Sequence, residues 1–218
     1  MSWIIHQYPR HIELRGIEIK LDAAMCSADI DLRWRHFSEP DFAMIALAGE
    51  DPCNVVSIYN QFAGDAVNYN LARTQMIVIP ARLIDGWVCY MWDMRRKVIH
   101  VLDPGNAMSV DNERRAMHSD LTGVVHRALS ELIASFFDDW TISEVPWPRT
   151  FPTLALQNFK EVDSGIAALY FTRHYDGNSL EVMLTKDAFE KAQRWMVYDV
   201  LKLEGNMGKI PSGAQDAM

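Results

Sequence analysis

The chain has 218 residues, 49% of them hydrophobic and 23% charged, which suits one globular domain with a substantial core. Its net charge is −8 and no apolar run approaches the roughly 20 residues that span a bilayer, so we expect neither nucleic acid nor a membrane as partner. Three cysteines without a CxxC pair indicate neither disulfides nor zinc, so we expect no cofactor and a reducing compartment, the nucleus or the cytoplasm.

The first half of the chain is predicted to be rich in strands. Residues 11–21 alternate apolar and polar side chains, which indicates a hairpin or an edge strand. Residues 54–62 have apolar side chains at helical spacing, which predicts a short helix. Three segments rich in β-branched and aromatic residues predict the central strands, 76–80, 87–94 and 97–104. The polar stretch 93–97 predicts a turn, so the last two strands should form an antiparallel hairpin.

The second half is predicted to be mostly helical. Apolar residues recur at spacings of three and four up to Phe136, and Ser119 and Asp120 are capping candidates for that helix. Residues 141–145 predict a strand, 147–152 a proline-rich loop, 164–171 a buried helix and 187–203 a last helix. We expect a single domain over residues 1–206 and a flexible tail over 207–218.

Two segments carry a recognisable pattern. The first runs from Ile79-Pro80 through Gly86-Trp87 to Asp103. It resembles, without a gap, the catalytic hairpin of the SUMO/ubiquitin-like protease family, which has Ile-Pro, His-Trp and Asp at these places. The second, residues 156–171, reads LQNFKEVDSGIAALYF and resembles the family's glutamine loop, its Asp-Cys-Gly and the helix that follows. Further on, the stretch YFTRHYDGNSL and the last helix, with Trp195, resemble degenerate, transposon-associated members that are abundant in plant genomes. Together the resemblance covers about residues 45 to 206.

The resemblance implies an α+β, papain-like cysteine protease fold with a central mixed or antiparallel sheet flanked by helices. The family's cysteine is held as a thiolate at a helix N-terminus beside an imidazole that an Asp orients. Here Gly86 stands at the histidine position and Ser164 at the cysteine position, while Asp103 keeps the acid. The family's oxyanion glutamine lies six residues before the nucleophile, which is Asn158 here, and Gln157 lies one residue further away.

Several residues keep two interpretations. Trp87, with Asp163 and Gly165, is implied to line the groove for a ubiquitin-like modifier, but Trp87 can equally be a core aromatic. Asp103 can be a relic of the triad or a turn residue, and Asp163 can cap the following helix.

Neither of two nearby groups is expected to serve Ser164 as a base. His100 is displaced from Asp103 by roughly 10 Å along an extended strand, and Asp85 is a carboxylate, which is a poor base for a serine hydroxyl. The basic pair Arg114-Arg115 is expected on the solvated surface.

These residues predict a protease-like domain that lacks the catalytic cysteine and histidine. We therefore expect that it is not an enzyme and that it acts by binding a protein. The expected partner is SUMO, another ubiquitin-like modifier or another regulatory protein. The alternative is an active SUMO/ubiquitin-like-specific isopeptidase, if Ser164 is an engineered replacement of a cysteine and another group serves as base.

Overall fold

The computed structural model describes residues 34–65, 67 and 69–201. In this part of the chain a five-stranded sheet has the order β1-β2-β3-β4-β5. The strands are β1 (Arg35–Phe37), β2 (Met76–Leu83), β3 (Gly86–Asp93), β4 (Val98–Leu102) and β5 (Arg149–Thr150). The pairs β2–β3 and β3–β4 are antiparallel and the two outer pairs are parallel, so the sheet is mixed.

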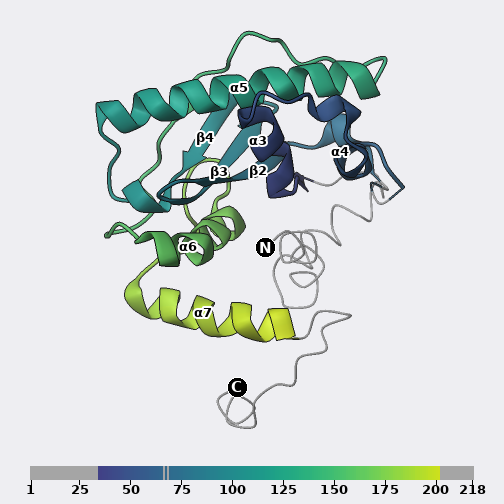
Figure 1. Ribbon diagram of the computed structural model, residues 1–218. Helices are drawn as coiled ribbons and strands as arrows, with labels where there is room; N and C mark the ends of the chain where they lie inside the picture. The colour runs from purple at the N-terminus through teal and green to yellow at the C-terminus, as the bar shows by residue number, and fades with distance from the viewer. Residues whose placement is uncertain (1–33, 66, 68, 202–218) are drawn as a thin grey trace.

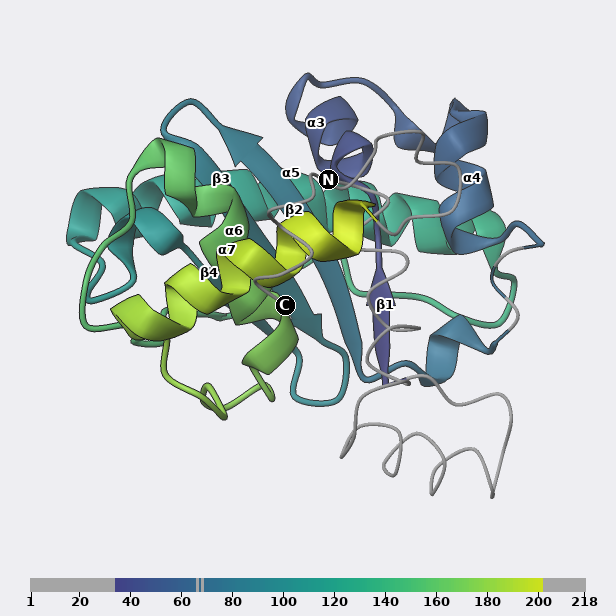
Figure 2. The same cartoon turned by 90° about the horizontal axis from the view of Figure 1, so that it is seen from below.

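Helices cover both faces of this sheet, with α5 on one side and α6 and α7 on the other (Figure 1). The α-helices are α3 (Pro40–Leu47), α4 (Val56–Phe62), α5 (Asn112–Phe136), α6 (Glu161–His174) and α7 (Lys186–Leu201). Three short 3-10 turns are η1 (Pro52–Asn54), η2 (Leu71–Arg73) and η3 (Pro104–Asn106). From below, α7 lies in front of α6 and both cross the sheet (Figure 2).

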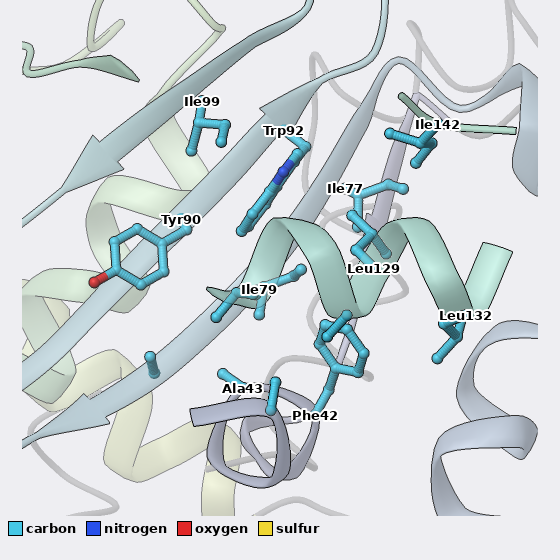
Figure 3. Close-up of a cluster of buried hydrophobic side chains, with 14 of the residues drawn as sticks. Phe42, Ala43, Ile77, Ile79, Tyr90, Trp92, Ile99, Leu129, Leu132 and Ile142 are labelled. Atoms are coloured by element: carbon cyan, nitrogen blue, oxygen red, sulfur yellow. The ribbon is translucent and has the colours of Figure 1, made fainter. Parts of the chain in front are cut away.

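The larger core lies between the sheet and helices α3 and α5 (Figure 3). Because successive strand residues point to opposite faces, Ile77 and Ile79 belong to this core, whereas Val78 packs toward α6. Trp92 of β3 is fully buried, and its indole N–H donates to Nδ1 of His126 on α5 at 3.0 Å. These contacts hold β3 in position against α5, and the first residue of β3 is Gly86.

The predicted central strands are confirmed, and so are the helices that correspond to α4, α6 and α7. The predicted start of the long helix is wrong. Helix α5 begins at Asn112, because the side chain of Asp111 caps it by accepting a hydrogen bond from the N–H of Arg114 at 2.8 Å. The predictions for residues 11–21 and for the tail lie outside the described residues.

The predicted strand at 141–145 is also wrong. Ile142 is buried, and the C=O groups of Ile142 and Ser143 accept hydrogen bonds from side chains of α5 rather than from a neighbouring strand. Strand β1 and helix α3 were not predicted, although Pro40 at the first helical position and Asp41 in the first turn are helix-start signals. Within the described residues, no helix is long and apolar enough to cross a membrane.

Candidate active site

The residues of the predicted site come from the start of β3, the end of β4 and the first turns of α6. Gly86 opens β3, Asp103 follows β4 directly, and Ser164 lies inside α6. The buried register of the β2–β3–β4 hairpins fixes the first two positions, and the packing of α6 on β3 fixes the third. All three side-chain positions are buried, since Ser164 is 1% exposed and Asp103 is 2% exposed.

Ser164 links α6 to β3 through its hydroxyl. Its Oγ accepts a hydrogen bond from the backbone N–H of Trp87 at 2.8 Å and donates one to the backbone C=O of Glu161 at 2.7 Å. Within the described part of the chain, no imidazole or carboxylate is a hydrogen-bond partner of this hydroxyl. The Ser164 proton therefore points to a peptide carbonyl and not to a general base. These two contacts are those of a hydroxyl that holds α6 against β3.

Gly86 has a conformation and surroundings that favour glycine. Its φ angle is +147°, a value that residues with a side chain rarely adopt. A Cβ atom on Gly86 would lie 2.7 Å from Oγ and 3.0 Å from Cβ of Ser164. Ser164 therefore occupies the space into which a side chain at position 86 would project, and the two positions are coupled sterically.

Asp103 is the centre of a buried polar network. Its Oδ1 accepts from the N–H of Gly105 at 2.9 Å, which caps the η3 turn. Its Oδ2 accepts from Nε of Arg114 at 2.8 Å and from Nε2 of His118 at 3.0 Å. The other ring nitrogen of His118 accepts from the hydroxyl of Tyr90 at 2.9 Å. Both imidazole nitrogens are thus engaged away from Ser164.

Arg114 and His118 contact Asp103, and neither contact was predicted from the sequence. The guanidinium group of Arg114 pairs with Asp103 and with Asp85, the residue before Gly86, and its side chain is only 14% exposed. The expectation that Arg114 is a solvated surface residue is therefore wrong. The capping position of Asp111, three residues earlier, is the one local signal that places Arg114 in the first turn of α5.

These contacts set the charge of Asp103. Burial by itself raises its pKa, but the hydrogen bonds from His118 and Arg114 outweigh burial and lower the pKa from 3.8 to about 2. Because the folded pKa lies below the unfolded one, the stabilisation is present above about pH 4 and is lost as the pH falls through about 2.

We expect this difference to appear in the acid unfolding of the protein. Between about pH 5 and pH 2, the wild-type protein should lose about 2 kcal/mol more of its free energy of unfolding than Asp103→Asn, which cannot titrate at this position. Chemical denaturation at each pH measures the two slopes, and groups common to both proteins cancel in their difference. Parallel slopes would mean that Asp103 is not ionised with a lowered pKa in the folded state.

The amide residues before Ser164 lie on an exposed loop. The side-chain Oδ1 of Asn158 accepts a hydrogen bond from the backbone N–H of Met108 at 3.0 Å, which ties this loop to the segment after η3. Gln157 is exposed beside it.

The expected cap at Asp163 is not formed, because α6 begins at Glu161 and Asp163 lies in its first turn. A carboxylate in the first turn is still stabilised by the positive end of the helix dipole. Gly165 is buried in the same helix.

Trp87 is half-buried at the edge of a small pocket. The pocket has a volume of ≈ 10 Å³, room for about one water molecule, and it is lined by Val78, Pro80, Trp87, Val88, Cys89, Ala168, Leu169 and Thr172. The guanidinium carbon of Arg82 lies 5.9 Å from the centre of the Trp87 ring, and Nη2 of Arg82 pairs with Glu161 at 2.5 Å. The groove beside Trp87 is therefore nearly filled in this structure.

The other titratable groups considered from the sequence lie apart from Ser164. His100 contacts the hydroxyls of Thr150 and Tyr175, away from the start of β3, as its position on β4 indicated. Cys89 is buried, and burial raises the pKa of its thiol to about 12, which disfavours the reactive thiolate form. Among the described residues, no group of three or more His, Cys, Asp or Glu side chains is placed to hold a metal ion.

Comparison with solved structures identifies the architecture. One match is a SUMO protease Ulp1 with its catalytic cysteine oxidised to a sulfonic acid, with a TM-score of 0.55 and 14% sequence identity over 78% of this chain and 71% of that chain. A second is the Ulp1 protease domain in complex with Smt3, the yeast ortholog of SUMO, with a TM-score of 0.51 and 14% identity over 78% and 70% of the two chains. The chain has the fold of the SUMO protease Ulp1.

A third match extends the likeness. The Ulp1-like SUMO protease catalytic domain of Chaetomium thermophilum has a TM-score of 0.51 and 16% identity, over 83% of this chain and 65% of that chain. No protein-family model and no curated protein matches the sequence. The predicted α+β, papain-like fold with a mixed sheet between helices is confirmed.

One expectation is corrected by the same matches. The sequence led us to expect that the chain is not an enzyme, but the solved structures with the Ulp1 fold are protease catalytic domains. The fold is therefore one that protease catalytic domains have.

Proposed function

We propose that this domain recognises a ubiquitin-like modifier. The observation that carries the proposal is the Ulp1 fold, because one of the matching protease domains was solved bound to Smt3. The net charge of −8 favours a protein partner over nucleic acid. Trp87 at the head of β3, with Pro80 beside it, supplies an aromatic surface next to the start of α6.

Access to Trp87 requires a local rearrangement. The pocket holds about one water molecule, and the side chain of Arg82 lies over the Trp87 ring. The ion pair between Arg82 and Glu161 joins side chains that are 35% and 54% exposed, so its stabilising energy is small and a ligand can displace it. Binding should therefore be possible without unfolding of β2 or α6.

Titration of isotope-labelled SUMO and of labelled ubiquitin with the whole protein tests the proposal. We expect binding of at least one modifier and a loss of affinity of tenfold or more in Trp87→Ala, about 1.4 kcal/mol or more. Trp195→Ala is the matched control, because this exposed tryptophan lies on α7. The absence of binding to both modifiers at about 1 mM, or equal losses in the two variants, would contradict the proposal.

Hydrolysis at the C-terminus of a modifier is a second candidate function, favoured by the protease domains among the matches. For this chemistry the Ser164 proton must leave the C=O of Glu161 and pass to a base. Incubation with a SUMO precursor and with a C-terminal vinyl-sulfone probe measures it. Processing that disappears in Ser164→Ala would assign the nucleophile, and processing that persists would exclude Ser164 from this role.

A further inference from the structure

The negative charge of the protein is concentrated in two segments of the chain. Residues 36–72 and 128–148 contain nine of the 29 Asp and Glu residues and none of the 21 Lys and Arg residues. The rest of the chain is therefore almost neutral, and the net charge of −8 arises from these two segments. Such an asymmetry produces a local negative potential that attracts basic groups from solution.

The fold brings parts of the two segments together at one end of the molecule. Helix α4 lies beside the C-terminal end of α5 in both views (Figures 1 and 2). The rings of Tyr59 on α4 and Phe136 at the end of α5 pack edge to face, with their centroids 5.2 Å apart. Burial, followed by the carboxylates of Asp51 and Glu131, raises the pKa of the Cys53 thiol to about 11. Carboxylates from both segments therefore act on the short η1 turn before α4.

Helix α4 presents an apolar face to solvent beside these charges. Its buried residues Ile58 and Phe62 pack into the core, whereas Val56 is 74% exposed and Tyr59 is 47% exposed. The two exposed residues are three positions apart and therefore share one face of the helix. Tyrosine is enriched among the residues that carry binding energy at protein interfaces, because its ring is apolar and its hydroxyl is polar.

Asp138 and Asp139 have an unfavourable position in the fold. They follow Phe137, the C-cap of α5, and so lie at the negative end of a 25-residue helix whose last turn has no basic residue. The carbonyl groups of that turn already carry a partial negative charge, so carboxylates next to them are repelled. Both side chains are exposed, and within the described residues neither forms an ion pair. A cation from outside the chain would relieve this repulsion.

We propose that this end of the molecule is a docking surface for a protein segment that carries Lys or Arg beside an aliphatic or aromatic side chain. We call it the α4–α5 corner, and it consists of Val56, Tyr59, Phe136, Asp138 and Asp139. Basic groups of the partner pair with the two aspartates and with the negative end of the α5 dipole, while its apolar side chain packs on the exposed face of α4. Nucleic acid and an anionic membrane surface have the wrong charge for this site.

The α4–α5 corner is separate from the candidate active site. Helix α4 packs on the core between the sheet and α5, whereas Ser164 lies in α6 on the opposite face of the sheet (Figure 1). Arg82 and Arg114, which pair with carboxylates near Ser164, lie outside both acidic segments. Docking at the corner therefore does not depend on recognition of a modifier.

An NMR titration of the whole, isotope-labelled protein with a synthetic amphipathic peptide of leucine and lysine tests this proposal. A leucine and glutamate peptide of the same pattern and a glycine and lysine peptide of the same charge serve for comparison. We expect the leucine and lysine peptide to shift the amide signals of α4 and of residues 136–140. It should bind at least tenfold more tightly than either comparison peptide, and added salt should weaken its binding.

A first pair of variants tests the charges. Asp138→Asn with Asp139→Asn should lose tenfold or more in affinity for the leucine and lysine peptide. The matched control is Glu113→Gln with Asp120→Asn, which removes two exposed carboxylates from the first half of the same helix and should bind as the wild type does. An equal loss in the two variants would overturn the proposal, and so would equal binding of the three peptides.

A second pair of variants tests the apolar face. Val56→Ser with Tyr59→Ser should also lose tenfold or more, whereas Ile84→Ser with Val182→Ser, at positions that are 98% and 51% exposed, should bind as the wild type does. Equal losses, or shifts confined to other parts of the protein, would contradict the assignment. Sedimentation velocity adds one more outcome. A dimer that dissociates in Val56→Ser with Tyr59→Ser would assign the corner to a second copy of the chain and would also overturn the proposal.

Discussion

Replacement of Asp103 by alanine is expected to lower the free energy of unfolding by about 3 to 5 kcal/mol, because it breaks a buried ion pair and leaves buried donors without their acceptor. His118 is fully buried and would lose the partner of its Nε2, and Arg114 would keep its pair with Asp85 and its contact with Sδ of Met117. The η3 turn would also lose its capping acceptor at Gly105. Urea unfolding, followed by tryptophan fluorescence, measures the change.

Two further variants separate the contribution of capping from the contribution of the charge that pairs with Arg114. Asp111→Ala removes a carboxylate that only caps α5, at an exposed position, and should cost about 1 kcal/mol. Asp103→Asn keeps an acceptor for Gly105 but removes the charge that pairs with Arg114, so its cost should lie between the two. If Asp103→Ala costs no more than Asp111→Ala, the buried network does not stabilise the fold.

The second large effect is expected at Gly86. Gly86→Ala should lower the free energy of unfolding by about 2 to 5 kcal/mol, because it combines an unfavourable φ angle with a steric clash against Ser164. Gly49→Ala provides the matched control, since Gly49 also has a positive φ, of +77°, but a Cβ atom there would meet nothing within 4 Å. The difference between the two variants measures the clash together with the greater backbone strain at a φ of +147°, and thermal or urea unfolding reports it.

A double-mutant cycle identifies the clashing partner. Ser164→Gly removes both atoms that a Cβ on Gly86 would approach, so Gly86→Ala should cost about 0.5 to 3 kcal/mol less in that background. Ser164→Gly by itself destabilises the protein, because it breaks the link to the N–H of Trp87. Additive costs, or equal costs of Gly86→Ala and Gly49→Ala, would show that the two positions are independent.

The same geometry limits an attempt to introduce the histidine and cysteine of the SUMO/ubiquitin-like proteases. A histidine at position 86 needs a different φ angle and the space that Ser164 now fills. The introduction of Gly86→His together with Ser164→Cys therefore requires the β2–β3 turn to move away from α6. Asp103 would also have to exchange a partner on α5 for the new imidazole, because His118 and Arg114 already occupy its Oδ2.

Much of the fold near the site could be predicted from the sequence. The ungapped run from Ile79 to Asp103 gave the two hairpins, because alternation and turn residues are local signals that act over a few positions. The compact apolar segment after Ser164 is also a local signal, and it correctly predicted a helix at α6. Strand β1 was missed because it has only three residues, and its pairing with β2 joins residues about 40 positions apart.

By itself, the sequence predicted the protease-like fold and pointed to Gly86, Asp103 and Ser164 as candidate site residues. Only the tertiary structure decided what these residues contact. The hydrogen bond from Trp87 to Ser164 spans 77 positions in the chain, and Arg114 reaches Asp103 only because α5 begins at Asn112. Such contacts depend on how packed elements approach one another, which no local pattern of side chains encodes.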